Sequence, residues 1–129
     1  MNLRGYQGLT VWNRSVDVVE LTYRLSETLS HGAARDLLTD MRRASLAIPT
    51  HLASGYQTRK TADYLRHVHA AQLALGQLES QLTIVERLGW AAEEETTDLQ
   101  SLLTHMHHLL GCLERYLTGQ SAELEAPSR

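Results

Sequence analysis

TADYLRHVHAAQLALGQLESQLTIVERLG, residues 61–89, has the clearest periodic pattern in the chain. Its apolar residues recur at alternating spacings of four and three positions, as Tyr64, Val68, Ala71, Leu75, Leu78, Leu82 and Val85. Because an α-helix turns once per 3.6 residues, this spacing places all of them on one face of a helix. Thr61 and Asp63 suit its start, and Gly89 suits its end. The stretch therefore predicts a long helix that packs one face against other helices.

Two other segments show the same kind of spacing. A helix from about residue 34 to residue 54 has its apolar face on Leu37, Met41, Ala44, Ile48 and Leu52. Pro49 lies inside it, and an interior proline removes a backbone hydrogen bond, so we expect a kink or break there, with Gly55 ending the helix. The last helix opens on Glu93–Glu95 and continues through Leu99, Leu103, Met106, Leu110, Leu113 and Leu117.

The segment from about residue 9 to residue 29 carries two apolar sets. The first has spacings of three and four positions and predicts the core-facing side of a helix: Leu9, Trp12, Val16, Val19 and Tyr23. The second lies on neighbouring angles: Val11, Val18, Leu21, Leu25 and Leu29. One packed face cannot use both sets, so we predict that the second set forms an interface between subunits of a homo-oligomer.

Four long helices with short connections predict an all-α fold. Connections of about 3–7 residues hold consecutive helices antiparallel. A spacing near 3.5 residues favours shallow, left-handed crossings. The predicted domain is an up-down-up-down left-handed four-helix bundle over residues 1–118, followed by a polar, disordered tail over residues 119–129.

The composition is that of a small globular protein. The chain has 129 residues, 43% of them apolar, and its single cysteine, Cys112, excludes an intramolecular disulfide. The start of the sequence lacks the apolar core of a signal peptide, and no run of about 18 apolar residues predicts a membrane span. We therefore expect a cytoplasmic protein that does not interact with membranes.

No pattern of catalytic or metal-binding residues stands out among the polar side chains. The seven histidines include pairs such as His67 and His69, whose spacing points their side chains to different sides of a helix. The Glu-x-x-His motif of di-iron bundles is absent from the sequence, as is a glycine-rich phosphate loop after a strand. We interpret the histidines as surface or partly buried residues, and we expect no enzymatic activity, cofactor or metal.

Basic residues gather in the first half of the chain. Residues 1–70 hold nine Lys or Arg and six Asp or Glu, whereas residues 71–129 hold three and nine. The candidate nucleic-acid-binding residues are Arg42, Arg43, Arg59, Lys60 and Arg66. Tyr56 and Tyr64 are available to stack on bases. For the first two arginines we favour a structural role, pairing with a carboxylate such as Glu79; the default for Arg59 and Lys60 is a solvated loop.

Residues 40–56, DMRRASLAIPTHLASGY, resemble a signature of the four-helix-bundle proteins encoded in intervening sequences of bacterial 23S ribosomal RNA genes. The family pattern is Arg-Arg-Ala, a small apolar run, Ile-Pro and then Gly, which here are residues 42–44, 48–49 and 55. His51 and Ser54 stand where the family usually has Asn and Glu. The resemblance covers about residues 6–118 and implies a ring-like homopentamer.

A related branch of that family, the accessory proteins of diversity-generating retroelements, binds a reverse transcriptase and its RNA template and is strongly basic. This chain departs from that branch, because its isoelectric point is near 6.1. The resemblance and the basic residues together predict a non-enzymatic oligomeric scaffold that contacts RNA or an RNA-bound protein. The alternative is a protein–protein adaptor that does not bind nucleic acid.

Overall fold

The computed structural model describes residues 5–29 and 32–125 of the chain, with side chains described to residue 120. Four α-helices make up most of it: α1 (Thr10–Thr28), α2 (Arg35–Thr58), α3 (Thr61–Arg87) and α4 (Glu93–Glu125). Two short 3₁₀ helices, η1 (Gly5–Gly8) and η2 (Gly32–Ala34), precede α1 and α2. These residues contain no strand, so the predicted all-α class with four helices is confirmed.

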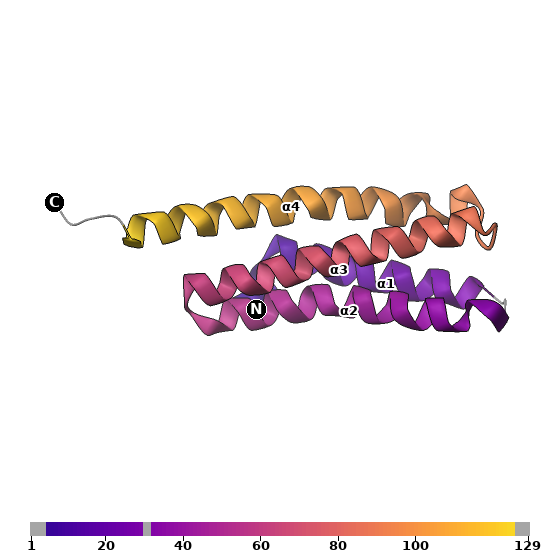
Figure 1. Ribbon diagram of the computed structural model, residues 1–129, viewed down its shortest axis with the longest axis horizontal. Helices are drawn as coiled ribbons and strands as arrows, with labels where there is room; N and C mark the ends of the chain where they lie inside the picture. The colour runs from indigo at the N-terminus through magenta and orange to yellow at the C-terminus, as the bar shows by residue number, and fades with distance from the viewer. Residues whose placement is uncertain (1–4, 30–31, 126–129) are drawn as a thin grey trace.

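The four helices lie side by side along the long axis of the molecule (Figure 1). α1 lies next to α2 and α4, and α3 also lies next to α2 and α4, whereas no described Cα atom of α1 is within 8 Å of one in α3. α1 therefore lies across the bundle from α3. The α2–α3 connection is at one end of the bundle, and the α3–α4 connection is at the other (Figure 1). None of the described helices is long and apolar enough to cross a membrane.

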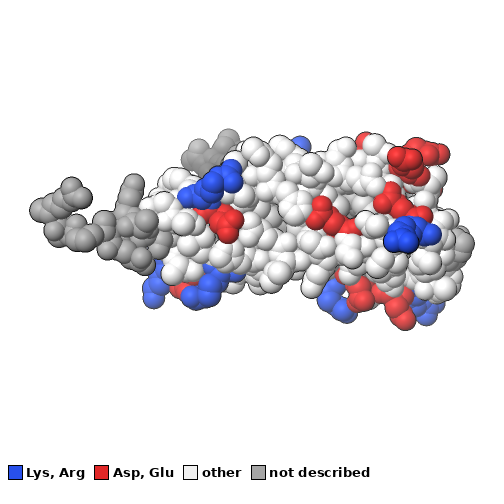
Figure 2. Space-filling view, turned by 45° about the horizontal axis from the view of Figure 1, so that its top comes forward, with Lys and Arg blue, Asp and Glu red and all other residues white. Residues whose placement is uncertain are grey.

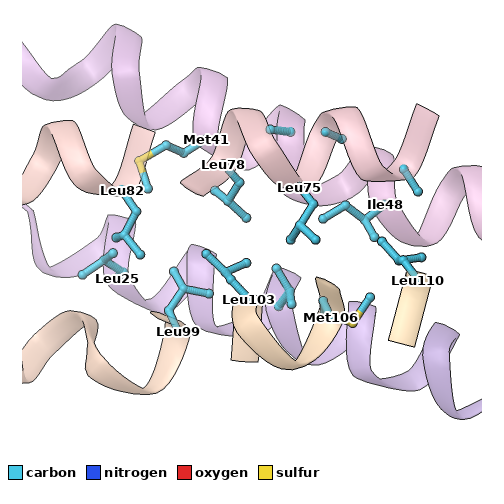
Figure 3. Close-up of a cluster of buried hydrophobic side chains, with 14 of the residues drawn as sticks. Leu25, Met41, Ile48, Leu75, Leu78, Leu82, Leu99, Leu103, Met106 and Leu110 are labelled. Carbon is cyan, nitrogen blue, oxygen red and sulfur yellow. The ribbon is translucent and has the colours of Figure 1, made fainter. Parts of the chain in front are cut away.

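The core is formed by leucine, methionine and isoleucine side chains from all four helices, which point toward one another in Figure 3. The face predicted for α3 is confirmed, with Tyr64 half-buried and the other six residues buried. The faces predicted for α2 and α4 are confirmed as well, except that Leu37 and Leu113 are only half-buried.

The core-facing side of α1 differs from the prediction. Its buried residues are Ser15, Val18, Thr22 and Leu25, whereas every member of the set predicted to face the core is half-buried. Two of the buried residues are polar, but each hydroxyl donates to a carbonyl of its own helix. Ser15 Oγ lies 2.6 Å from the Trp12 oxygen, and Thr22 Oγ1 lies 2.7 Å from the Val18 oxygen. Burying these side chains therefore leaves no hydroxyl without a partner.

The predicted oligomer interface on the first helix is wrong at three positions. Val18, Leu25 and Leu29 belong to the core of the single chain, and Val18 has 0% of its surface exposed. A side chain in the core of the chain is not accessible to another subunit. The remaining two members, Val11 and Leu21, are half-buried and pack against the same core.

α2 is longer than predicted and runs without interruption through Pro49 and Gly55 to Thr58. The expected break at the buried Pro49 is absent, because packing on neighbouring helices sustains α2 on both sides of it. Gly55 lies where α3 packs closely against α2. A Cβ atom added there would be 2.8 Å from the His67 Cβ and 2.9 Å from the Tyr64 Cδ1. Gly55 is therefore a packing residue and not a helix terminator.

The ends of α3 and α4 were predicted with mixed success. Gly89 adopts a left-handed conformation with φ of 72°, and its N–H donates to the Glu86 carbonyl over 3.0 Å, as expected of a glycine that ends a helix. Thr61 is the first helical residue, so Lys60 occupies the N-cap position. α4 continues through Gly119 to Glu125, so the first part of the predicted disordered tail is helical, and the rest of that tail, residues 126–129, lies outside the described residues. One glycine without a following proline did not end this helix.

Candidate nucleic-acid interface

The five basic residues singled out in the sequence do not form one patch. Arg43 and Arg59 are both carried by α2 or its C-cap, and the helix separates them by roughly 24 Å at a rise of about 1.5 Å per residue. Lys60 follows directly, and Arg66 lies near the start of α3. The structure therefore separates the two arginines in the middle of α2 from three basic residues around the α2–α3 connection.

Arg42 contacts an aromatic ring and a hydroxyl group of the same chain. Its guanidinium carbon lies 5.9 Å from the centre of the Tyr23 ring, and its Nη2 donates to Thr39 Oγ1 over 3.4 Å. The carboxylate predicted to pair with it, that of Glu79, instead contacts His107 of α4. Arg42 therefore has contacts within the single chain, but not with the carboxylate that was predicted.

Arg43 and Arg66 each contact an aspartate one turn earlier on the same helix. Arg43 Nη1 lies 3.1 Å from Asp40 Oδ1, and Arg66 pairs with Asp63 in the same way. Both arginines are exposed, so these ion pairs contribute little to stability and leave the guanidinium groups solvated. Each pair still reduces the local positive charge that a phosphate would meet.

Arg59 and Lys60 differ from Arg43 and Arg66 because no described acidic residue forms an ion pair with either of them. Both are exposed and make up the whole connection between α2 and α3. Tyr56, 38% exposed, lies one turn before them on α2. We call Tyr56, Arg59 and Lys60 the α2–α3 corner. It combines two available cations with an accessible aromatic ring.

Tyr64 supports this corner and does not present a free ring of its own. It is half-buried, and its ring meets that of Tyr56 edge to face, with centres 6.2 Å apart and planes at 78°. Burial, and then the neighbouring Tyr56, raise the pKa of the Tyr64 hydroxyl above its ordinary value. The predicted pair of stacking tyrosines is therefore one exposed ring held by a second, packed one.

The surface around these residues is not uniformly basic. On the face shown in Figure 2, blue and red groups lie beside one another near both ends, and much of the surface between them is uncharged. This mixture agrees with the net charge of −3. Any attraction for an anion is therefore local, because the molecule as a whole does not supply a broad positive field.

The model of one protein family, described as 23S rRNA-intervening sequence protein, matches residues 7–112. The chain belongs to this family. The match begins in η1, spans α1 to α3 and ends within α4, so it includes the α2–α3 corner. No curated protein matches the chain.

The histidines of this family member pair between helices, which the sequence did not predict. His51 of α2 and His67 of α3 place their Nδ1 atoms 3.0 Å apart, so one ring donates to the other. His69 Nε2, on the other side of α3, lies 2.8 Å from Glu114 Oε2 of α4. The spacing of two residues thus sends His67 and His69 to different neighbouring helices. Among the described residues, no group of three or more His, Cys, Asp or Glu could hold a metal ion.

Because of the His51–His67 contact, we expect the folded protein to be less stable in acid. Burial, and then the facing His67, lower the pKa of His51 below 6.5, so the folded state resists a proton that the unfolded chain accepts. Stability is therefore full above about pH 6.5 and falls as the pH drops through and below that value. The slope is a fraction of the roughly 1.4 kcal/mol per pH unit of one fully coupled proton.

Urea unfolding at about pH 7.5, 6.5 and 5.5 measures this slope directly. His51→Gln should flatten it, whereas His108→Gln, at an exposed position on α4, should not. An unchanged slope in His51→Gln would contradict the assignment. Glu114 affects stability in a different pH range. Hydrogen bonds from His69 and Gln72 lower its pKa below 4.5, so its contribution to folding stability is lost only as the pH falls below that value.

Proposed function

We propose that this member of the family is a non-enzymatic, ring-like homo-oligomeric scaffold that contacts RNA, or an RNA-bound protein, through its α2–α3 corner. The observation that supports RNA contact is the presence of two cations without an acidic partner among the described residues, beside an exposed tyrosine. Cations attract the phosphate backbone, and an aromatic ring stacks on any base. The corner thus offers both kinds of contact without a sequence-specific pattern.

Self-association is supported by an apolar groove between α1 and α2, of about 440 Å³. We call it the α1–α2 groove. Its apolar lining consists of Tyr6, Trp12, Val16, Val19, Leu46, Pro49 and Ala53. This groove contains most of the α1 residues that the sequence had placed in the core. An apolar surface of this kind on a small helical protein is typical of an interface.

A second copy of the chain offers a surface that fits this groove. Leu73 and Ile84 of α3 and Leu88 at its C-cap are exposed, and Leu73 is 72% exposed. Their spacings of 11 and 4 residues correspond to about three helical turns and one turn, so the three side chains share one outer face of the helix. α3 lies across the bundle from α1. A head-to-tail contact between these two different faces repeats from copy to copy and closes into a ring when the rotation permits.

The finer features expected from the sequence and from the resemblance are part of the same proposal. They are an up-down-up-down order with left-handed crossings, a pentameric ring and a cytoplasmic, bacterial setting. The short α2–α3 connection of two residues supports the antiparallel order of those helices.

RNA titration of the untagged protein tests the corner. The Arg59→Glu, Lys60→Glu double variant should bind RNA at least about tenfold more weakly at low salt, because it loses two contacts with phosphates. Each lost contact should also reduce the slope of log affinity against log salt concentration by about 0.7 to 0.9. Arg14→Glu, Arg24→Glu is the matched control, since it changes the net charge equally at two exposed arginines of α1. It should retain most of the affinity.

An equal loss of RNA affinity in both double variants would mean that the net charge of the protein, and not the α2–α3 corner, drives binding. No RNA binding by the wild-type protein at low salt would overturn RNA contact. The adaptor alternative would then be the better account, and partners captured from a lysate should survive nuclease treatment.

A further inference from the structure

A hollow of about 680 Å³ lies beside the α2–α3 corner, between η1 and the last turn of α2. Its lining residues come from two segments about fifty positions apart in the sequence: Gly5, Tyr6, Gln7, Tyr56, Gln57 and Arg59. A volume of this size is within the usual range of about 300–1,000 Å³ for small-molecule sites. Two tyrosines, two side-chain amides and one arginine line it. They favour a planar aromatic group with polar edges and an anionic substituent.

The two aromatic walls of the hollow are fixed by their neighbours. The Tyr6 ring packs on Trp12, with ring centres 5.1 Å apart. Tyr56 is held by the edge-to-face contact with Tyr64. Gly5 has φ of 57° and lies beside Tyr56, where an added Cβ atom would be in ordinary van der Waals contact with the ring, 3.5 Å from the Tyr56 Cε1. Rings held in this way lose little freedom when a ligand stacks on them.

Arg59 occupies a backbone conformation that favours glycine. Its φ is 59°, and it is the one residue other than glycine with positive φ in the described part of the chain. The C-terminal position of a helix commonly has glycine in this conformation, because a side chain there is strained. A strained arginine that also lines a hollow is consistent with a functional role for its guanidinium group. An arginine at position 59 is therefore less favourable for local stability than a glycine would be.

We propose that this hollow binds one unpaired nucleotide, with its base stacked on Tyr56 and its phosphate at Arg59. Gln7 and Gln57 supply amide donors and acceptors for the edge of the base. This inference rests on the proposed function where the nucleotide belongs to an RNA strand. A free mononucleotide has the same chemistry and is the other source. A fully paired duplex does not expose a base face for stacking.

Three probes separate these sources: adenosine monophosphate, a single-stranded RNA of about ten nucleotides, and a blunt RNA duplex. The single strand should bind more tightly than the duplex at the same salt concentration. Tyr56→Leu should weaken single-strand binding about tenfold and leave duplex binding unchanged, because only the single strand stacks. Tyr56→Phe retains the ring and should bind like the wild type.

Arg59→Gly distinguishes a ligand-binding arginine from a structural one. Glycine relieves the backbone strain, so the midpoint of thermal unfolding should rise by about 2–5 °C. Affinity for the single strand should nevertheless fall at least about fivefold, because the phosphate loses its partner. An arginine with a purely structural role would instead show lower stability on replacement.

The outcomes separate this inference from the proposed function. Single-strand binding that is lost in Arg59→Glu, Lys60→Glu but unchanged in Tyr56→Leu would overturn the nucleotide site and leave the RNA-contacting scaffold intact. Binding of adenosine monophosphate that depends on Tyr56, without any RNA binding, would support the site for a free nucleotide and overturn RNA contact. Absence of binding to all three probes would overturn both.

Discussion

Val18→Asp is expected to unfold the protein, whereas Val19→Asp, one residue later, should leave the chain folded and disperse the oligomer. Val18 is fully buried in the core, and a carboxylate there would lack both water and a partner. Such a change costs about 4 kcal/mol or more, which is comparable with the total stability of a small domain. Val19 is half-buried in the α1–α2 groove, so an aspartate there remains solvated in the single chain.

Far-ultraviolet circular dichroism and sedimentation velocity read the two effects separately. Val18→Asp should lose helical signal at room temperature. Val19→Asp should retain it and lower the unfolding free energy by no more than about 1 kcal/mol, while its sedimentation coefficient falls to that of a monomer. A wild-type protein that is monomeric at micromolar concentration would contradict the assembly. If Val19→Asp left the oligomeric state unchanged, the α1–α2 groove would not be part of the interface.

The α1 error shows what periodicity cannot resolve. Ser15, Val18, Thr22 and Leu25 have the same spacing of three and four as the apolar set that was chosen for the core. The choice counted apolar residues only, so two hydroxyl residues made the true core face look weaker. A serine or threonine that hydrogen-bonds to its own helix can be buried without loss. The surplus apolar set is then half-buried beside the core, and a second copy can cover its exposed part.

Helix α3 was predictable because its apolar pattern is regular over about six turns and Gly89 ends the helix in the expected conformation. The end of α2 was not, because glycine has two uses in helices. At Gly55 the residue permits close packing, and the left-handed position is taken by Arg59. Local sequence does not distinguish these uses, since the difference depends on the distance to a neighbouring helix.

The candidate site was predictable only in part, for the same reason. Arg59, Lys60 and Tyr56 are close in sequence, so their proximity follows from the helix–helix connection. The contribution of Tyr6 and Gln7 to the hollow depends on the packing of η1 on α2, which no local pattern reveals. The predicted grouping of Arg42 and Arg43 with the corner was wrong, because α2 extends between them and the corner.

Gly55→Ala is expected to destabilise the protein by up to about 2 kcal/mol, although alanine is the better helix former. The added Cβ would lie 2.8 Å from the His67 Cβ, whereas carbon atoms in contact are normally about 3.5–4.0 Å apart. Because the His67 Cβ is bonded directly to the α3 backbone, rotation of a side chain cannot relieve the clash, and the two helices must separate. Overpacking of this kind costs about 1–3 kcal/mol, partly offset by about 1 kcal/mol of helix propensity.

Gly76→Ala is the matched control, because Gly76 is also within a helix but has no atom within 4 Å of the added Cβ. It should stabilise the protein by up to about 1 kcal/mol, so the two glycine-to-alanine changes should have opposite signs in urea unfolding. Gly55→Val should cost at least about 3 kcal/mol, since it adds two more methyl groups to the same contact. If both alanine variants were more stable than the wild type, α2 and α3 could not approach each other closely at Gly55. The position of Tyr64, and with it the support of Tyr56 in the α2–α3 corner, would then need revision.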